Sequence, residues 1–311
     1  MDTWLRDQIQ KYPALGLIGN TPLVRVDLFS EELPDVAIFA KIESFNPGGS
    51  VKDRPVMRML LEGIRAGHLT PEKTILDSSS GNAGIAYASI GGLLGYKVKI
   101  VMPDNVSTER KQRIKSHGAE LLFTEGVSGY DEAMRTCHRL YEENPNQYFF
   151  SNQYENNWNW KAHYDTTAAE ILSQTDGHLT HFVVGVGTGG TITGVGRRLK
   201  EANPNIKIIS VLPDNFPGIE GLKPLRGPND IRPKILDESV IDEWLDVTAD
   251  DAFNICQRLA KRGLFVGQSS GAFLYGAYQV AKREKVGTLV TLFPDIGERY
   301  FSSGLWEDLD F

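Results

Sequence analysis

Short runs of apolar, often β-branched residues alternate along this chain with stretches in which apolar residues recur every three or four positions. The short runs are typical of buried strands, and the longer amphipathic stretches are typical of helices. We predict strands at residues 38–41, 74–77, 97–102, 120–124, 182–185, 206–211 and 288–293. We predict helices at residues 51–66, 83–94, 108–117, 130–143, 163–173, 192–202, 249–262 and 273–283.

This alternation of strands and helices predicts an α/β fold with parallel sheets that are flanked by helices. A run of four strand–helix units ends near Tyr148, which favours two lobes. The predicted boundaries are residues 38–148 for a smaller domain, and residues 1–37 together with 149–311 for a larger one. Residues 216–237 are rich in glycine and proline and form the longest segment without a predicted element. Loops of that length are often lids or binding loops.

Composition narrows the function classes. Hydrophobic residues make up 41% of the chain and charged residues 23%, which is ordinary for a folded globular protein. A net charge of -7 argues against nucleic-acid binding, and no apolar run is long enough to span a membrane. The N-terminus lacks a signal-peptide pattern. Cys137 and Cys256 stand apart from any metal-ligand spacing, so we predict no metal site and a reducing, cytoplasmic setting.

A lysine, Lys52, stands at the predicted beginning of a helix. Ser50 and Asp53 have the spacing of a helix capping box, which would place Lys52 in the first helical turn. The helix dipole disfavours a cation there. One interpretation is that the amine is consumed by a Schiff base to a carbonyl cofactor. The other is a solvated surface lysine beside a capping box, and this segment alone does not separate the two.

Two further loops follow predicted strands, and ligands collect at the carboxyl ends of parallel strands. Residues 185–191 form a glycine-rich turn before a helix, which suits a phosphate because backbone N–H groups and the helix N-terminus face the anion. Residues 77–84 offer serine hydroxyls and N–H groups that suit a carboxylate. The spacing of Gly185, Gly187 and Gly190, with Asp214 beyond them, also fits a dinucleotide fingerprint.

Together the lysine and these loops predict a ligand with a carbonyl and a phosphate, acting on an amino acid. Several segments of the chain resemble the cysteine synthases of the tryptophan-synthase-β-like group, the fold type II pyridoxal-phosphate (PLP) enzymes. The similar segments are residues 19–23, 46–54, 80–84, 187–191, 269–272 and 294–300, in the family's order. The resemblance covers essentially the whole chain and implies two lobes, each with a mostly parallel twisted sheet flanked by helices.

The resemblance implies a role for each matching residue. Lys52 would form the Schiff base with PLP and later act as the general base. Asn82 would bind the oxygen at the 3′ position of the pyridine ring, and Ser269 the ring nitrogen. The phosphate would be held by Gly187, Thr188, Gly189, Gly190 and Thr191. The substrate carboxylate would be held by Ser79, Ser80, Gly81, Ala83 and Gln153. The smaller domain would be the mobile substrate-binding one, and the larger would bind the phosphate.

The implied reaction is a β-replacement that makes L-cysteine from an O-activated serine and a sulfur donor through an α-aminoacrylate. Residues 218–223 resemble the B-type subgroup, whose members differ in using O-acetylserine or O-phosphoserine. The donor would be sulfide, thiosulfate or a sulfur-carrier protein thiocarboxylate, and the protein a homodimer. Lys223 and Arg226 are either ligands for a phosphate or solvated loop cations.

The chain departs from the family pattern at Ser79 and Ala83, where threonine is common, so Ala83 offers the carboxylate its backbone N–H but no hydroxyl. Two alternative functions stay open at this point. One is a cystathionine β-synthase or cysteine desulfhydrase with the same PLP chemistry. The other is an NAD(P)-dependent dehydrogenase built on residues 185–190, although that interpretation leaves Lys52 unexplained.

Overall fold

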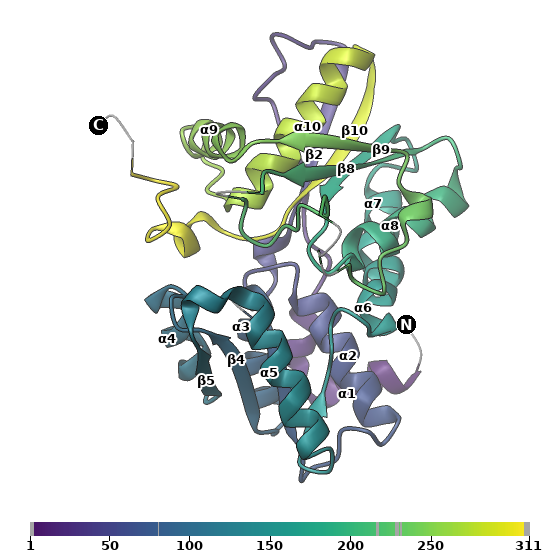
Figure 1. Cartoon of the computed structure of the whole chain (residues 1–311). Coiled ribbons are helices and arrows are strands. Elements are labelled where there is room, and N and C mark those ends of the chain that lie inside the picture. Colours follow the sequence, from purple (N-terminus) through teal and green to yellow (C-terminus); the bar gives the residue numbers. More distant parts are fainter. Residues whose placement is uncertain (1–2, 80, 216–217, 228–229, 231, 308–311) are drawn as a thin grey trace. The chain divides into compact units, whose positions relative to one another are not determined.

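The computed structural model describes residues 3–79, 81–215, 218–227, 230 and 232–307 (Figure 1). The chain forms two compact units, which are described separately here. The first unit comprises Met1–Ile18 and Asn46–Asn159, and the second comprises Gly19–Phe45 and Trp160–Phe311. None of the described helices is both long enough and apolar enough to cross a membrane.

The first unit is built on a parallel sheet in the order β5-β4-β3-β6. Its strands are β3 (Thr74–Ser78), β4 (Val98–Pro103), β5 (Glu120–Thr124) and β6 (Tyr148–Phe150). Its helices are α1 (Thr3–Lys11), α2 (Asp53–Arg65), α3 (Asn82–Leu93), α4 (Thr108–Ser116), α5 (Gly129–Glu143) and the first half of α6 (Asn157–Ala162).

Alternation along β3 divides the first unit into two apolar layers, because successive side chains of a strand point to opposite faces. Ile75 packs in the cluster that contains residues of α2 and α3, such as Met59 and Tyr87. Leu76 packs instead with Cys137 of α5. By the same alternation Asp77 faces the α3 side and Ser78 faces the α5 side of the sheet.

The second unit contains a six-stranded sheet in the order β1-β2-β10-β7-β8-β9, in which only the β1–β2 pair is antiparallel. The strands are β1 (Leu23–Arg25), β2 (Val36–Ile42), β7 (His181–Gly185), β8 (Lys207–Pro213), β9 (Glu243–Val247) and β10 (Gly287–Phe293). The longer helices are α7 (Ala168–Gln174), α8 (Gly190–Ala202), α9 (Ala249–Ala260) and α10 (Gln268–Glu284).

Helices α8 and α10 cover opposite faces of this second sheet. A Cβ built on Gly196 of α8 would lie 3.5 Å from Ile208, whereas one on Gly276 of α10 would lie 2.4 Å from Val211. Ile208 and Val211 are three positions apart on β8, so their side chains point to opposite faces. Glycine at position 276 therefore lets α10 approach the sheet more closely than any larger residue would allow.

The predicted α/β class, with two lobes and mostly parallel sheets flanked by helices, is confirmed. The division between units differs from the predicted boundaries of residues 38–148. Strand β2 pairs along its whole length with β10, which places it in the second unit. Leu5 of α1 packs in the apolar cluster of the first unit. The roles predicted for the two domains stay predictions.

Several element predictions were wrong. The segment predicted as one helix at residues 163–173 comprises a π-helical turn at His163–Thr167 and α7, and α6 precedes it directly. Helix α10 begins at Gln268, five residues before the helix predicted at residues 273–283. Strands β1, β6 and β9 and helix α1 were not predicted.

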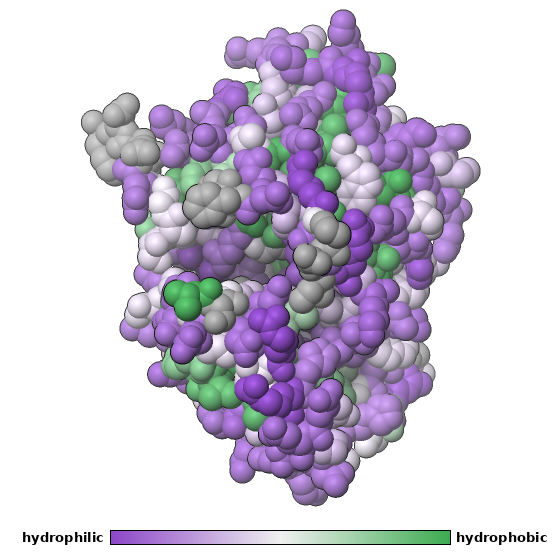
Figure 2. All heavy atoms as spheres, viewed as in Figure 1, coloured by the Kyte–Doolittle hydropathy of each residue, from purple (hydrophilic) through white to green (hydrophobic). Residues whose placement is uncertain are grey.

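The surface drawn in Figure 2 is mostly hydrophilic, with scattered hydrophobic residues. Val127, Phe45 and Val286 are the large apolar side chains with most exposure among the described residues.

Candidate active site

Lys52 lies in the turn that leads into α2, in the first unit. Gly49 adopts a φ of 75°, in the left-handed region that favours glycine. The Asp53 carboxylate accepts a hydrogen bond from the backbone N–H of Gly48. A Cβ on Gly48 would lie 2.2 Å from that carboxylate, so the turn requires glycine there as well. Both glycines and Asp53 thus fix the turn that carries Lys52, which is half-buried.

The predicted capping box at Ser50 and Asp53 was wrong. Lys52 is the N-cap residue of α2 and makes no side-chain capping bond, and the Asp53 carboxylate accepts from Gly48. The Ser50 hydroxyl accepts a hydrogen bond of 3.3 Å from the Lys52 backbone N–H. Lys52 nevertheless lies at the positive end of the α2 dipole, where the arrangement does not favour its charge.

The asparagine loop, which we define as Ser79 and Gly81–Gly84, joins β3 to α3 in the same unit. The Ser79 hydroxyl oxygen accepts hydrogen bonds from the N–H groups of Gly81, at 3.1 Å, and Gly84, at 2.8 Å. The first intrahelical bond runs from Ile85 N to Gly81 O. The Ala83 N–H precedes it, at the position where helices leave donors for an anion. Ser80 lies outside the described residues.

Gln153 and Tyr130 hold the strand end from which this loop departs. Gln153 Nε2 donates to the Ser78 carbonyl at 3.2 Å, and Tyr130 Oη donates to the same carbonyl at 2.9 Å. The Ser78 hydroxyl lies 3.1 Å from Tyr130 Oη. The structure therefore brings Gln153 to the base of the asparagine loop, where its amide is engaged with backbone. Whether it also reaches a carboxylate stays a prediction.

Asp77, beside this junction, is buried. Burial raises the pKa of Asp77 to about 7, because desolvation disfavours the charged form. Hydrogen bonding, including that from the Ser78 N–H, offsets part of this effect on the pKa.

Burial likewise raises the pKa of the Cys256 thiol to about 12, so this cysteine is an inert core residue.

The predicted phosphate loop, residues 185–191, lies between β7 and α8 in the second unit. A Cβ on Gly187 would lie 2.5 Å from the Gly221 carbonyl oxygen, so only glycine fits there. Gly189 has a φ of 84° and immediately precedes Gly190, the first residue of α8. The five predicted phosphate residues thus form one continuous turn at a helix N-terminus, which is an anion-binding geometry.

His163 contacts this loop, which sequence reasoning did not foresee. Its Nε2 lies 3.4 Å from Thr191 Oγ1, and its Nδ1 lies 2.9 Å from Thr167 Oγ1. The ring is buried within the π-helical turn that packs against α8. π-Helical turns are frequent at functional sites. This turn indicates a functional role for His163, and it is visible only in the structure.

Ser269 lies in the first turn of α10, buried, after the N-cap residue Gly267. A Cβ on Gly267 would lie 2.1 Å from the Asp295 carboxylate, which accepts a hydrogen bond from Tyr300 at 2.7 Å. The C-terminal motif at residues 294–300 therefore packs against the turn that presents Ser269. The adjacent Gln268 accepts a hydrogen bond from the Glu220 N–H, next to the Gly221 that packs on the phosphate loop.

Lys223 and Arg226 lie in the segment beyond Gly221. The Lys223 backbone N–H donates to the Val186 carbonyl at 2.8 Å, which ties this segment to the phosphate loop. The Arg226 guanidinium forms an ion pair with Asp246 near the surface. This pair favours the surface-cation interpretation of Arg226 over a role as a phosphate ligand.

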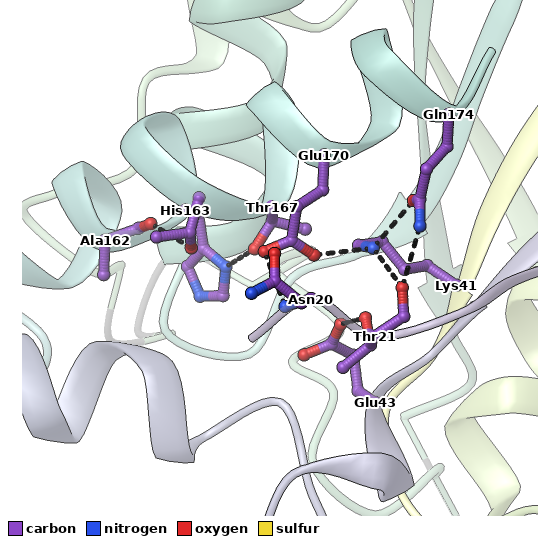
Figure 3. Close-up of polar contacts among 10 residues, drawn as sticks. Asn20, Thr21, Lys41, Glu43, Ala162, His163, Thr167, Glu170 and Gln174 are labelled. Carbon is purple, nitrogen blue, oxygen red and sulfur yellow. Dashed lines mark hydrogen bonds and ion pairs between the residues drawn. The ribbon is translucent and has the colours of Figure 1, made fainter. Parts of the chain in front are cut away.

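An ion pair between buried Lys41 and half-buried Glu170 anchors Asn20 and Thr21 of the early motif (Figure 3). Lys41 Nζ lies 2.7 Å from Glu170 Oε2 and donates to the Thr21 carbonyl at 2.9 Å. Glu170 Oε1 accepts from the backbone N–H of Asn20, which has a φ of 49°. In Figure 3, Glu170 points from its helix toward Lys41. Glu170 and His163 lie on the same helical stretch. The motif is therefore explained by structure within the second unit.

Comparison with known proteins agrees with the geometry. Residues 14–295 match the family described as "Pyridoxal-phosphate dependent enzyme". The chain belongs to this family of PLP enzymes. It is 48% identical over 304 residues to a protein named cysteine synthase from Aquifex aeolicus (strain VF5), covering 95% of this chain and 92% of that one. It is 39% identical to cysteine synthase B of Escherichia coli (strain K12), covering 94% and 96%.

A solved structure gives the same result for the fold. The cysteine synthase (OASS) of Entamoeba histolytica superposes with a TM-score of 0.89 at 36% identity, covering 96% of this chain and 91% of that chain. Membership of a PLP family rules out the nicotinamide interpretation of Gly185, Gly187 and Gly190. The glycines instead form a cradle that a Cβ at position 187 would fill, and this fits a phosphate of the predicted cofactor.

Proposed function

We propose that this PLP enzyme is a cysteine synthase, which replaces the β-substituent of an O-activated serine by sulfur. The named activity of its relatives supports the reaction. The observation that carries the proposal is Lys52 at the beginning of α2, in a turn that Gly48, Gly49 and Asp53 fix. A lysine held there in a PLP family is placed to bind the cofactor's carbonyl carbon.

Bound PLP supplies a carbonyl for the substrate amine and a ring that accepts electrons released at the α-carbon. We propose that Lys52 Nζ holds the cofactor and, once displaced by the substrate amine, takes the proton from Cα as a general base. The Ser269 hydroxyl would bind the ring nitrogen. A neutral hydroxyl stabilises a protonated ring nitrogen less than a carboxylate would, which favours prompt loss of the β-substituent.

The phosphate loop would hold the cofactor phosphate through the N–H groups of Gly187, Gly189 and Gly190 and the hydroxyls of Thr188 and Thr191. The N-terminus of α8 adds favourable potential for the dianion. Asn82, the first residue of α3, would bind the ring oxygen.

The asparagine loop would orient the substrate α-carboxylate with the N–H groups at the start of α3, such as that of Ala83. The Ser79 hydroxyl is already an acceptor for two N–H groups of its own loop, so its oxygen shapes the loop. Its remaining hydrogen is left to donate to the carboxylate. This division of roles compensates for the missing hydroxyl at Ala83.

The test is an assay with two candidate donors. The purified holoenzyme is mixed separately with O-acetylserine and O-phosphoserine, and the absorbance of the bound cofactor is followed before and after sulfide is added. A spectral change with one ester, reversed by sulfide with formation of cysteine, supports the proposal and identifies the donor. If neither ester changes the spectrum but serine with homocysteine forms cystathionine, the cysteine-synthase proposal fails.

We further propose, from the resemblance, that the enzyme is a cytoplasmic homodimer that takes sulfide, thiosulfate or a sulfur-carrier thiocarboxylate. Light scattering of the purified protein tests the dimer. Replacing sulfide by thiosulfate in the assay tests the sulfur donor.

A further inference from the structure

Asp77 is an ionisable residue near the end of the buried strand β3, and it is 1% exposed. Its Oδ1 accepts a hydrogen bond of 2.7 Å from the backbone N–H of Ser78. The mechanism above assigns Asp77 no role. A carboxyl in this setting needs an explanation, because burying a charge without an ion pair is costly.

Ser78 connects Asp77 to the asparagine loop. Its N–H is held by Asp77, and its carbonyl is held by Tyr130 and Gln153. The next residue, Ser79, donates its N–H to Val101 O at 3.1 Å and accepts from Gly81 and Gly84 through its hydroxyl. A shift of the Ser78 peptide would therefore move the residues that we propose to receive the substrate carboxylate.

The groups around the Asp77 carboxyl are neutral ones from three elements. Tyr87 of α3 and Gln153 after β6 lie beside it. Tyr130 and Cys137 of α5 and Tyr154 after β6 also lie close enough for the charge of Asp77 to raise their pKa values. The carboxylate of Asp131 lies near Tyr154. Burial raises the pKa of Asp77 to about 7, and the effects that lower it are all hydrogen bonds.

We propose that Asp77 is a positioning residue of the asparagine loop and that its neutral acid is the form that admits an anionic ligand there. The positioning role rests on the contacts alone, whereas the ligand rests on the proposed function. An ionised Asp77 would place a second negative charge at the base of a loop that receives a carboxylate. Like charges at one site disfavour each other, so ligand binding and protonation of Asp77 should support one another.

Two substitutions separate the positioning role of Asp77 from the effect of its charge. Asp77→Asn keeps an oxygen that can accept from the Ser78 N–H and is always neutral, whereas Asp77→Ala leaves that buried N–H without its acceptor. The exposed Asp35→Asn controls for loss of a carboxylate elsewhere. The dissociation constant of O-acetylserine is measured from the cofactor absorbance between about pH 6 and about pH 8.5, which brackets the titration of Asp77.

In wild type and Asp35→Asn, affinity should weaken by roughly tenfold more over this range than in Asp77→Asn. Asp77→Ala should bind about tenfold more weakly than Asp77→Asn at every pH, because one buried hydrogen bond is lost. If Asp77→Asn follows the wild-type pH profile, the role of the charge is disproved.

Hydrogen exchange of the peptide that spans residues 79–84, without ligand, tests the positioning role independently. Exchange should be faster in Asp77→Ala than in Asp77→Asn, and equal exchange in both variants would overturn the positioning role. A wild type that gives no response to the ester would count against the proposed function, whereas the exchange comparison would still decide the role of Asp77.

Discussion

The hydroxyl oxygen of Ser79 lies 2.8 Å from the backbone nitrogen of Gly84 and 3.1 Å from that of Gly81. The side chain therefore caps the start of α3 from within the loop that we propose to bind the substrate carboxylate. A Cβ on Gly84 would lie 3.3 Å from the Ser79 Cβ, so both residues are close-packed.

Ser79→Ala should lower the free energy of unfolding by about 1 kcal/mol, the usual effect of losing a helix cap. It should also raise the KM for the O-activated serine while leaving cofactor binding unchanged. Ser79→Thr is the control, since it keeps the hydroxyl. Urea unfolding and steady-state kinetics measure the two effects. A KM that rises equally in both variants would contradict the capping role.

Lys52→Ala should lose the covalent attachment of PLP. Its rate of cysteine formation should fall by a factor of about 10² to 10⁴, the range typical of a lost general base. The exposed Lys97→Ala should behave as wild type. Reduction with borohydride followed by peptide mass spectrometry measures the attachment: the cofactor should be fixed to the peptide that contains Lys52. Recovery of the cofactor on another lysine would disprove the assignment.

Gly187→Ala should weaken the binding of PLP by roughly 10- to 100-fold, because its Cβ would lie 2.5 Å from the Gly221 carbonyl oxygen. Titration of the apoenzyme with PLP measures the effect. Lys97→Ala is the control, since its side chain is exposed and lies outside the phosphate loop. Equal affinity for PLP in both variants would argue against the phosphate loop.

The sequence predicted the parallel strands β3, β4, β7, β8 and β10 because buried strands read as continuous apolar runs. Strands β1, β6 and β9 were missed: β1 and β6 have only three residues each, and most side chains of β9 are partly exposed. The lysine turn and the glycine-rich loop were predicted because their chemistry is local in sequence.

The support of these loops could not be predicted. Tyr130 lies 52 residues from the Ser78 carbonyl to which it donates, and His163 lies 28 residues from Thr191. Such contacts depend on which faces of the elements meet. The capping prediction at Ser50 failed for a related reason: the Asp53 carboxylate has a nearer backbone donor in Gly48, which the spacing rule does not consider.

Lys41 is a buried cation whose loss should destabilise the protein. Its side chain is 0% exposed beside Glu170 at 2.7 Å, so Lys41→Met should leave a carboxylate facing an apolar group and cost about 3 to 5 kcal/mol of unfolding free energy. The double variant Lys41→Met, Glu170→Gln should recover part of that loss. Lys282→Met, which removes an exposed cation 3.8 Å from Glu32, should change stability by less than about 1 kcal/mol. A double variant no more stable than Lys41→Met would argue against the ion pair.

Asp77 should make the stability of the protein depend on pH. Its pKa is raised from 3.8 to about 7 by burial, so the folded protein holds a proton that the unfolded chain has released. The stability contributed by the neutral acid is fully present below about pH 4 and is lost as the pH rises through about 7. The complete loss is about 4 kcal/mol, from a shift of about three units.

Asp77→Asn never ionises, so its stability relative to wild type should increase between about pH 5 and about pH 8. Urea unfolding of both proteins at the two pH values measures this difference, and Asp35→Asn serves as the control because its carboxylate is exposed. The comparison cancels other titrating groups, which are common to both proteins. A difference between Asp77→Asn and wild type that is the same at both pH values would show that Asp77 remains in one protonation state throughout, and the pH dependence of ligand binding inferred from it would fall as well.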